Sequence, residues 1–227
     1  MRRDFKLKKL IFTICVLIPV IVLTLGAASS SEKPSQAENE EFRQAVEAVK
    51  NKNYSEAILL FEAQAKKARH DAQYNLAVLL SAGKGRPRNY SDALFWAWLA
   101  QLGNIEAAKD LANDVFGRLP EKHVDEIRKR VQESLQARID VNDRQAIPQF
   151  ADFHLSILEE PDHINAYIWY SIAAALNIPD ANLLRDDVET ELEEKELVEA
   201  QTTTQELFDK YKFKPLIEPI GGEKNDN

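Results

Sequence analysis

Few residues of this 227-residue chain are spaced as a catalytic site would require. Ser81 and Lys84 have the S-x-x-K spacing of penicillin-recognising serine enzymes, in which the serine is the nucleophile. The S-D-N and K-T-G motifs that accompany this spacing in those enzymes are absent from the sequence. The same segment contains glycines that suit a tight loop between helices, so we interpret Ser81 and Lys84 as loop residues.

Other candidate sites also lack a part that their chemistry needs. His154 and His163 flank the acidic segment 159–162, but no H-x-x-x-H pair supports a metal site there. Residues 83–85 read G-K-G, which lacks the longer pattern and the following Ser or Thr of a phosphate-binding loop. Carboxylates are so frequent on the expected helices that no pair stands out as acid and base. We therefore predict no catalytic residue, no metal site and no cofactor.

Aromatic side chains are better candidates for a functional role, because Trp and Tyr often anchor a protein partner. Trp98 lies two residues after Trp96 on an expected helix, so the two side chains face different directions. Trp98 is either an exposed anchor for a partner or a packing residue against a neighbouring hairpin. Tyr74, Tyr90 and Tyr170 are the other predicted partner-binding residues, and the same two alternatives apply to them.

Two charged segments are further candidates for contact with a partner. Lys84, Arg86 and Arg88 form a small basic loop in an acidic chain, whereas residues 186–199 hold eight acidic residues and one lysine. Each segment is either a solvated surface or a docking site for a partner of opposite charge.

The elements that position these residues are predicted to be helices. Seven Gly and nine Pro are too few for a turn-rich β protein, and runs of Ala, Leu, Glu and Lys favour helix. The formal net charge is −8, and because residues 1–28 hold five basic residues and one acidic, the remainder carries −12. Such an acidic surface disfavours binding to polyanions, so we expect no nucleic-acid partner.

The beginning of the sequence has the layout of an export signal. A basic segment at residues 1–9 is followed by an uncharged apolar run, residues 10–25, and then by small residues. We interpret residues 1–28 as a signal peptide or an uncleaved membrane anchor, with membrane contact only through residues 10–28 if uncleaved. Both alternatives predict a periplasmic protein, or one anchored in the inner membrane and facing the periplasm. Cys15, the single cysteine, lies in the apolar run, so the exported part would contain no disulfide.

Two stretches of the chain are similar at a separation of 73 residues. From Ala93 the sequence reads ALFWAWLAQLGNIEAA, and from Ala166 it reads AYIWYSIAAALNIPDA. Equivalent helix positions recur every 34 to 39 residues, so the 73-residue unit contains two helical hairpins. We predict an all-α solenoid of antiparallel helix hairpins over residues 41–211, between a polar linker (29–40) and a flexible tail (212–227).

Residues 72–108 resemble the Sel-one-like repeat, a branch of the tetratricopeptide superfamily. They follow the pattern A-x3-L-A-x5-G-K-G-x-P-R-N-Y-x2-A-x2-W-x3-A-x2-G-N-x3-A. Residues 146–181 keep part of this pattern but have lost both loop glycines. The repeat-signature positions, at which we expect packing, are Ala72, Leu76, Gly83, Gly85, Ala93, Trp96, Ala100, Ala166, Trp169 and Ala173.

The resemblance implies a right-handed α-solenoid with a concave groove, in an exported or membrane-anchored bacterial protein. It also implies a non-enzymatic interaction or scaffold module of the cell envelope that binds a peptide or protein partner in the groove. One alternative is a structural or assembly factor that self-associates. The least expected alternative is a hydrolase acting on cell wall or peptides.

Overall fold

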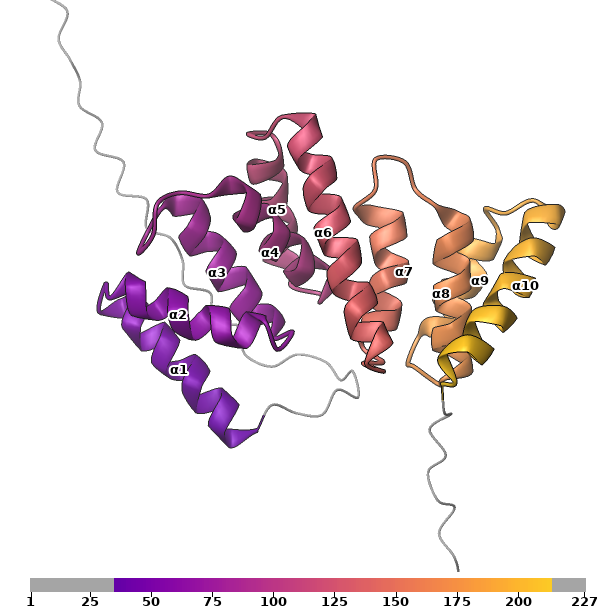
Figure 1. The fold of residues 1–227 in the computed structure, drawn as a ribbon, viewed down its shortest axis with the longest axis horizontal. Coiled ribbons are helices and arrows are strands. Elements are labelled where there is room, and N and C mark those ends of the chain that lie inside the picture. Colours follow the sequence, from indigo (N-terminus) through magenta and orange to yellow (C-terminus); the bar gives the residue numbers. More distant parts are fainter. Residues whose placement is uncertain (1–34, 214–227) are drawn as a thin grey trace, which may run out of the picture.

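The structure of this chain, a computed structural model, describes residues 35–213, which form ten α-helices and no strand (Figure 1). The prediction of an all-α protein is therefore confirmed. In chain order the helices are α1 (Gln36–Lys50), α2 (Tyr54–Ala65), α3 (His70–Ala82), α4 (Tyr90–Leu102), α5 (Glu106–Phe116), α6 (Glu121–Asp140), α7 (Ala146–Ser156), α8 (His163–Ala175), α9 (Ala181–Glu189) and α10 (Glu194–Tyr211).

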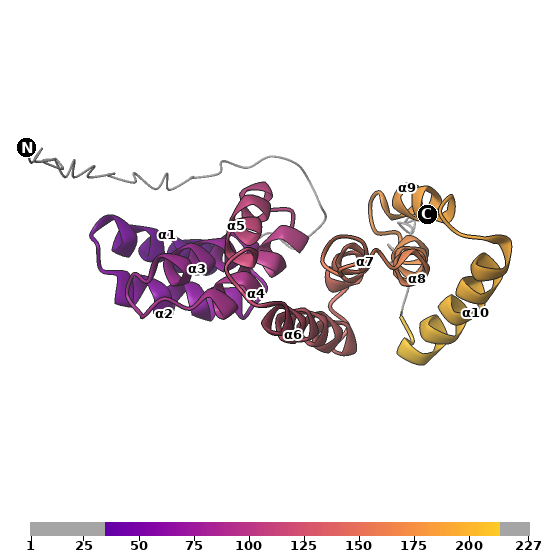
Figure 2. The same ribbon diagram turned by 90° about the horizontal axis from the view of Figure 1, so that it is seen from above.

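The helices pack as hairpins and then as two similar four-helix units. The pairs α1/α2, α3/α4 and α7/α8 are hairpins of sequence neighbours in contact. In the first unit α5 and α6 both pack against α4, and in the second unit α9 and α10 both pack against α8. Helix α6 also packs against α7 and lies between α4 and α7 when the molecule is seen from above (Figure 2). The 73-residue similarity thus corresponds to one four-helix unit, built twice.

Equivalent side chains cap and connect the helices of the two units. The Asn89 side chain accepts a hydrogen bond from the backbone N–H of residue 92 at the start of α4, and Asp162 does the same at the start of α8. Asn104 and Asn177, which follow α4 and α8, both have positive φ, 62° and 56°. Asn tolerates this left-handed conformation better than most residues, so the helix boundaries recur for local reasons.

Small buried residues allow the helices to approach closely. The repeat-signature alanines and Leu76 are almost completely buried, and Trp169 is buried as well. The signature alanines are Ala72, Ala93, Ala100, Ala166 and Ala173. Trp96 is only half-buried and packs against the edge of the core, so it fills less of the interior than its counterpart Trp169.

A directed chain of side-chain hydrogen bonds joins the two units. Arg138 can only donate, and its Nη1 lies 2.6 Å from Gln149 Oε1, so the amide nitrogen of Gln149 faces His70 Nε2 at 2.9 Å. His70 Nε2 must accept this bond, so Nδ1 carries the proton and donates to Gln73 Oε1 at 2.9 Å. Gln73 in turn donates to the carbonyl of Ala65 at 3.1 Å. The chain connects α6 and α7 to α3 and α2.

One predicted boundary is wrong, and two predicted segments lie outside the described residues. Helix α1 begins at Gln36, inside the predicted linker, because Ser35 and Glu38 form a capping box. Within residues 35–213 no helix is long and apolar enough to cross a membrane. The predicted signal peptide or anchor, residues 1–28, and most of the tail lie outside this range.

Candidate partner-binding groove

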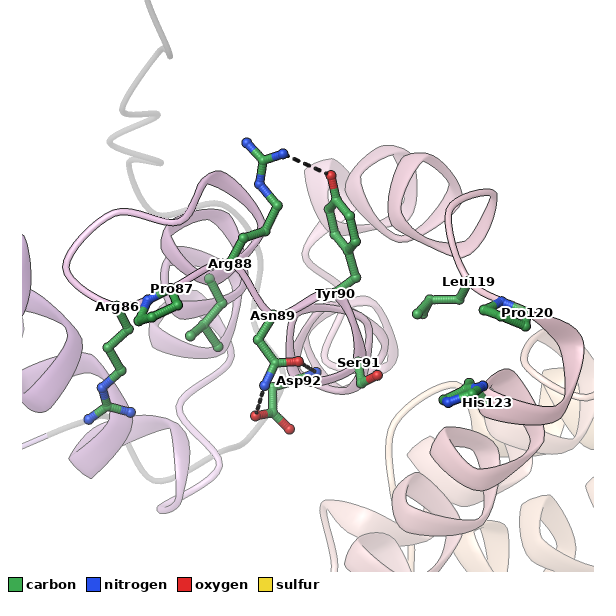
Figure 3. Close-up of a pocket in the computed structure, with 11 residues that line it drawn as sticks. Arg86, Pro87, Arg88, Asn89, Tyr90, Ser91, Asp92, Leu119, Pro120 and His123 are labelled. Atoms are coloured by element: carbon green, nitrogen blue, oxygen red, sulfur yellow. Dashed lines mark hydrogen bonds between the residues drawn. The ribbon is translucent and has the colours of Figure 1, made fainter.

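An open groove of about 650 Å³ lies where the loop between α3 and α4 faces the connection between α5 and α6 (Figure 3). One wall comes from the loop and the first turn of α4, and the other from the end of the connection and the first turn of α6. Its lining residues are Leu80, Arg86, Pro87, Arg88, Asn89, Tyr90, Ser91, Asp92, Leu119, Pro120 and His123.

Two glycines shape the loop that forms the first wall. Gly83 has φ +67° and ends α3, while the backbone N–H of Lys84 donates to the carbonyl of Leu79 at 3.0 Å. Gly85 has φ +80°, and a Cβ atom there would lie 2.5 Å from the carbonyl group of Tyr54. The loop therefore lies directly against the start of α2, where only glycine fits. This confirms the tight loop geometry predicted from the sequence.

Charged and amide side chains fix the first turn of α4. Asn89 caps this helix and also donates to Asp92 Oδ2 at 2.7 Å. The other oxygen of Asp92 accepts a hydrogen bond from Arg130 on α6 at 2.9 Å. This ion pair holds α6 beside α4, so the two walls of the groove are tied together.

Tyr90 stands between two arginines at the rim of the groove. Arg88 Nη1 donates to the Tyr90 hydroxyl at 3.2 Å, as Figure 3 shows. The guanidinium carbons of Arg88 and Arg118 each lie 5.6 Å from the centre of the Tyr90 ring. Tyr90 is half-buried and both arginines are exposed, so this cluster faces solvent.

The rim carries an excess of positive charge. Arg86 pairs with Glu62 at 2.9 Å, and Arg118 pairs with Asp114 at 2.7 Å. Arg88 forms no ion pair within residues 35–213. Both ion pairs are exposed, and exposed pairs contribute at most about 1 kcal/mol, so the arginines can exchange partners.

Two of the predicted aromatic anchors are core residues. Trp98 is only 6% exposed, and its ring centre lies 6.5 Å from that of Phe116 on α5. Tyr170 is 1% exposed and donates its hydroxyl hydrogen to Asp152. The prediction that they are exposed anchors is wrong, because both project from the sides of α4 and α8 that neighbouring helices cover.

The remaining predicted residues occupy separate places. Tyr74 is half-buried on α3, and burial raises the pKa of its hydroxyl group, with a smaller contribution from Asp110. It does not line the groove, whereas Tyr90 does. Tyr90 is thus the one predicted aromatic residue that the structure places in this groove.

The segments considered for catalysis or metal binding have structural contacts instead. Ser81 Oγ donates to the carbonyl of Val78 at 3.0 Å, and Lys84 lies over the Tyr54 ring at 5.1 Å. His154 is buried, and this burial lowers its pKa, although Asp162 opposes the shift. Among residues 35–213 no group of three or more His, Cys, Asp or Glu could hold a metal ion.

The sequence analysis did not find the second wall of the groove. Leu119, Pro120 and His123 lie about one hairpin away from the basic loop in the sequence, and no local pattern relates the two segments. The signal that could have related them is the L-P-E-K-H-V segment, which returns in altered form as L-E-E-K-E-L at Leu192.

Comparisons with known proteins give no name to the chain. No protein-family model and no curated protein matches it. Among solved structures it is similar to a protective antigen present in uropathogenic Escherichia coli strains, which displays an SLR fold. The identity is 18%, the TM-score is 0.36, and the match covers 77% of this chain and 30% of that chain. The helices themselves define the class: an all-α helical-repeat protein with a duplicated four-helix unit.

Proposed function

We propose that this chain is a non-enzymatic protein-interaction module of the cell envelope, and that a segment of a protein partner binds in the groove. The observation that carries this proposal is the cluster of Arg88, Tyr90 and Arg118 at the rim of an open groove. Tyr and Arg are enriched among the residues that dominate binding energy at protein interfaces. The cluster is held by a rigid loop, which lowers the entropy cost of binding.

The chemistry of the rim favours an acidic segment. Guanidinium groups bind carboxylates through two parallel hydrogen bonds, and Arg88 has no carboxylate partner within the described range. Leu119 and Pro120 offer an apolar surface on the opposite wall for the carbon atoms of the same segment. The envelope location is supported by the basic and apolar segments of residues 1–28.

Site-specific crosslinking in living cells tests this function. A photoreactive amino acid at His123, an exposed residue of the groove, should give a defined protein adduct. The same probe at Lys67 is the control, because this exposed residue precedes α3 and lies at the opposite end of that helix from the groove.

The substitution Arg88→Glu should abolish the His123 adduct while leaving the circular-dichroism spectrum and melting temperature unchanged. An adduct that forms equally well with Glu at position 88, or no adduct at His123, would show that the groove does not bind a partner.

A further inference from the structure

The loops that close the hairpins of the two units form one continuous edge of the molecule. The connections α3–α4, α5–α6, α7–α8 and α9–α10 all lie on the same side in Figure 1. Phe116, Leu119 and Glu159 line a shared pocket of about 300 Å³, so the first unit's edge adjoins the second's. Arg128 Nε also donates to the carbonyl of Ile157 at 3.0 Å, which fixes these neighbouring segments together.

The charge of this edge reverses from the first unit to the second. Segments 84–92 and 117–123 of the first unit carry five basic and two acidic residues, a net charge of +3. The equivalent segments of the second unit, 157–165 and 190–196, carry one basic and seven acidic residues, a net charge of −6. We call the first pair of segments the basic edge and the second pair the acidic edge.

The reversal affects exposed positions and leaves the scaffold in place. Arg118 in the basic edge is replaced by Glu191 in the acidic edge, and both are exposed. Leu119 and its counterpart Leu192 are apolar, and both pack against the core. Glu191 forms no ion pair within residues 35–213. The acidic edge is therefore free to pair with external cations.

We propose that two copies of this chain associate edge to edge about a two-fold axis, with the basic edge of each facing the acidic edge of the other. This inference rests on the proposed function of the groove as a protein-binding surface and names its occupant. The two edges lie side by side, and the axis passes between them. Rotation by 180° about it therefore matches both pairs at once, with identical spacing in each copy. Such closed, self-complementary contacts are the commonest form of protein association.

Two simultaneous contacts make the pairing stronger than either contact alone. Once one basic edge has met an acidic edge, the second contact is intramolecular and forms at a high effective concentration. The exposed pairs Arg86–Glu62 and Arg118–Asp114 oppose it only weakly, because such pairs contribute little stability. Like-charged edges facing each other would be repelled, which selects the antiparallel arrangement.

A charge-swap experiment tests this pairing with the full-length chain, purified in mild detergent and measured by light scattering after size exclusion. Wild-type protein should have twice the protomer mass, which is 25.8 kDa for the full chain. Variant Arg88→Glu/Arg118→Glu and variant Glu160→Arg/Glu191→Arg should each be monomeric, because each creates two contacts between like charges. An equimolar mixture of the two variants should recover the dimer, because both of its contacts again join opposite charges.

Lys67→Glu/Lys109→Glu, two exposed lysines away from this edge, is the matched control and should remain dimeric. Wild-type monomers at all concentrations, dimers that ignore the single-edge reversals, a mixture that stays monomeric, or species that grow with concentration would each overturn the two-fold pairing. If the wild type is monomeric but the His123 probe still captures a different protein, this inference fails and the proposed function stands. If neither association nor an adduct occurs, both fail.

Discussion

Replacing Trp98 by Ala should destabilise the fold and leave the groove chemistry intact. As an exposed anchor, Trp98 could be removed without a change in melting temperature. The structure instead buries this side chain between α4 and α5, in contact with Phe116. The substitution would therefore remove an indole ring from the core and leave a cavity.

The size of the effect follows from the burial of the ring. Trp98 is 6% exposed, and substituting a buried aromatic residue by Ala costs about 3–5 kcal/mol. In a chain of this size a loss of about 1 kcal/mol lowers the melting temperature by about 2–4 °C. We therefore expect a decrease of about 6–20 °C. Ala is also the best helix former, so helix propensity does not add to the loss.

Thermal unfolding followed by circular dichroism at 222 nm measures this decrease. Trp96→Ala is the matched control, because Trp96 lies on the same helix but is half-buried and should cost clearly less. Equal melting temperatures for wild type and Trp98→Ala, with a loss of crosslinking at His123, would refute the packing role. That result would restore the interpretation of Trp98 as an anchor.

Three further predictions concern the loop, a buried histidine and a buried tyrosine. Gly85→Ala should lower the free energy of unfolding in urea by about 1–3 kcal/mol, whereas Gly117→Ala, with no close neighbour and a helical φ, should be nearly neutral. Burial lowers the pKa of His70, so the free energy of unfolding should be highest above about pH 6.5 and fall as the pH drops through the lowered pKa; His70→Asn should flatten this pH dependence. Tyr170→Phe should cost about 1–3 kcal/mol at neutral pH, because it removes the donor to the largely buried Asp152, whose pKa burial already raises; an unchanged urea midpoint would contradict this.

Features that depend on local chemistry were predictable from the sequence. The repeated Ala positions, the glycines of the α3–α4 loop and the order of the hairpins all appear as expected. Each depends on residues within one helix or one turn, where spacing and conformational preference decide the outcome. The same local logic would have placed the start of α1 correctly, since Ser35 and Glu38 are a readable capping box.

Features that depend on contacts between distant segments were not predictable. Trp98 is buried because Phe116 lies across from it on α5, and no spacing rule relates these two residues. The groove exists because two connections about 30 residues apart converge on the same edge. The bond from Gln149 to His70 links positions 79 residues apart. Only the packing of whole helices brings such pairs together.

The comparison of the two units separates packing from surface specialisation on physical grounds. Ala93 and Ala166 are completely buried, and a larger side chain at either position would force two helices apart. Arg118 and Glu191 occupy equivalent exposed positions, where a change of charge costs the fold almost nothing. Differences at such positions are therefore free to record selection by a binding partner. Because all the large charge changes between the units lie on one edge, that edge is the surface at which partner contacts would have shaped this sequence.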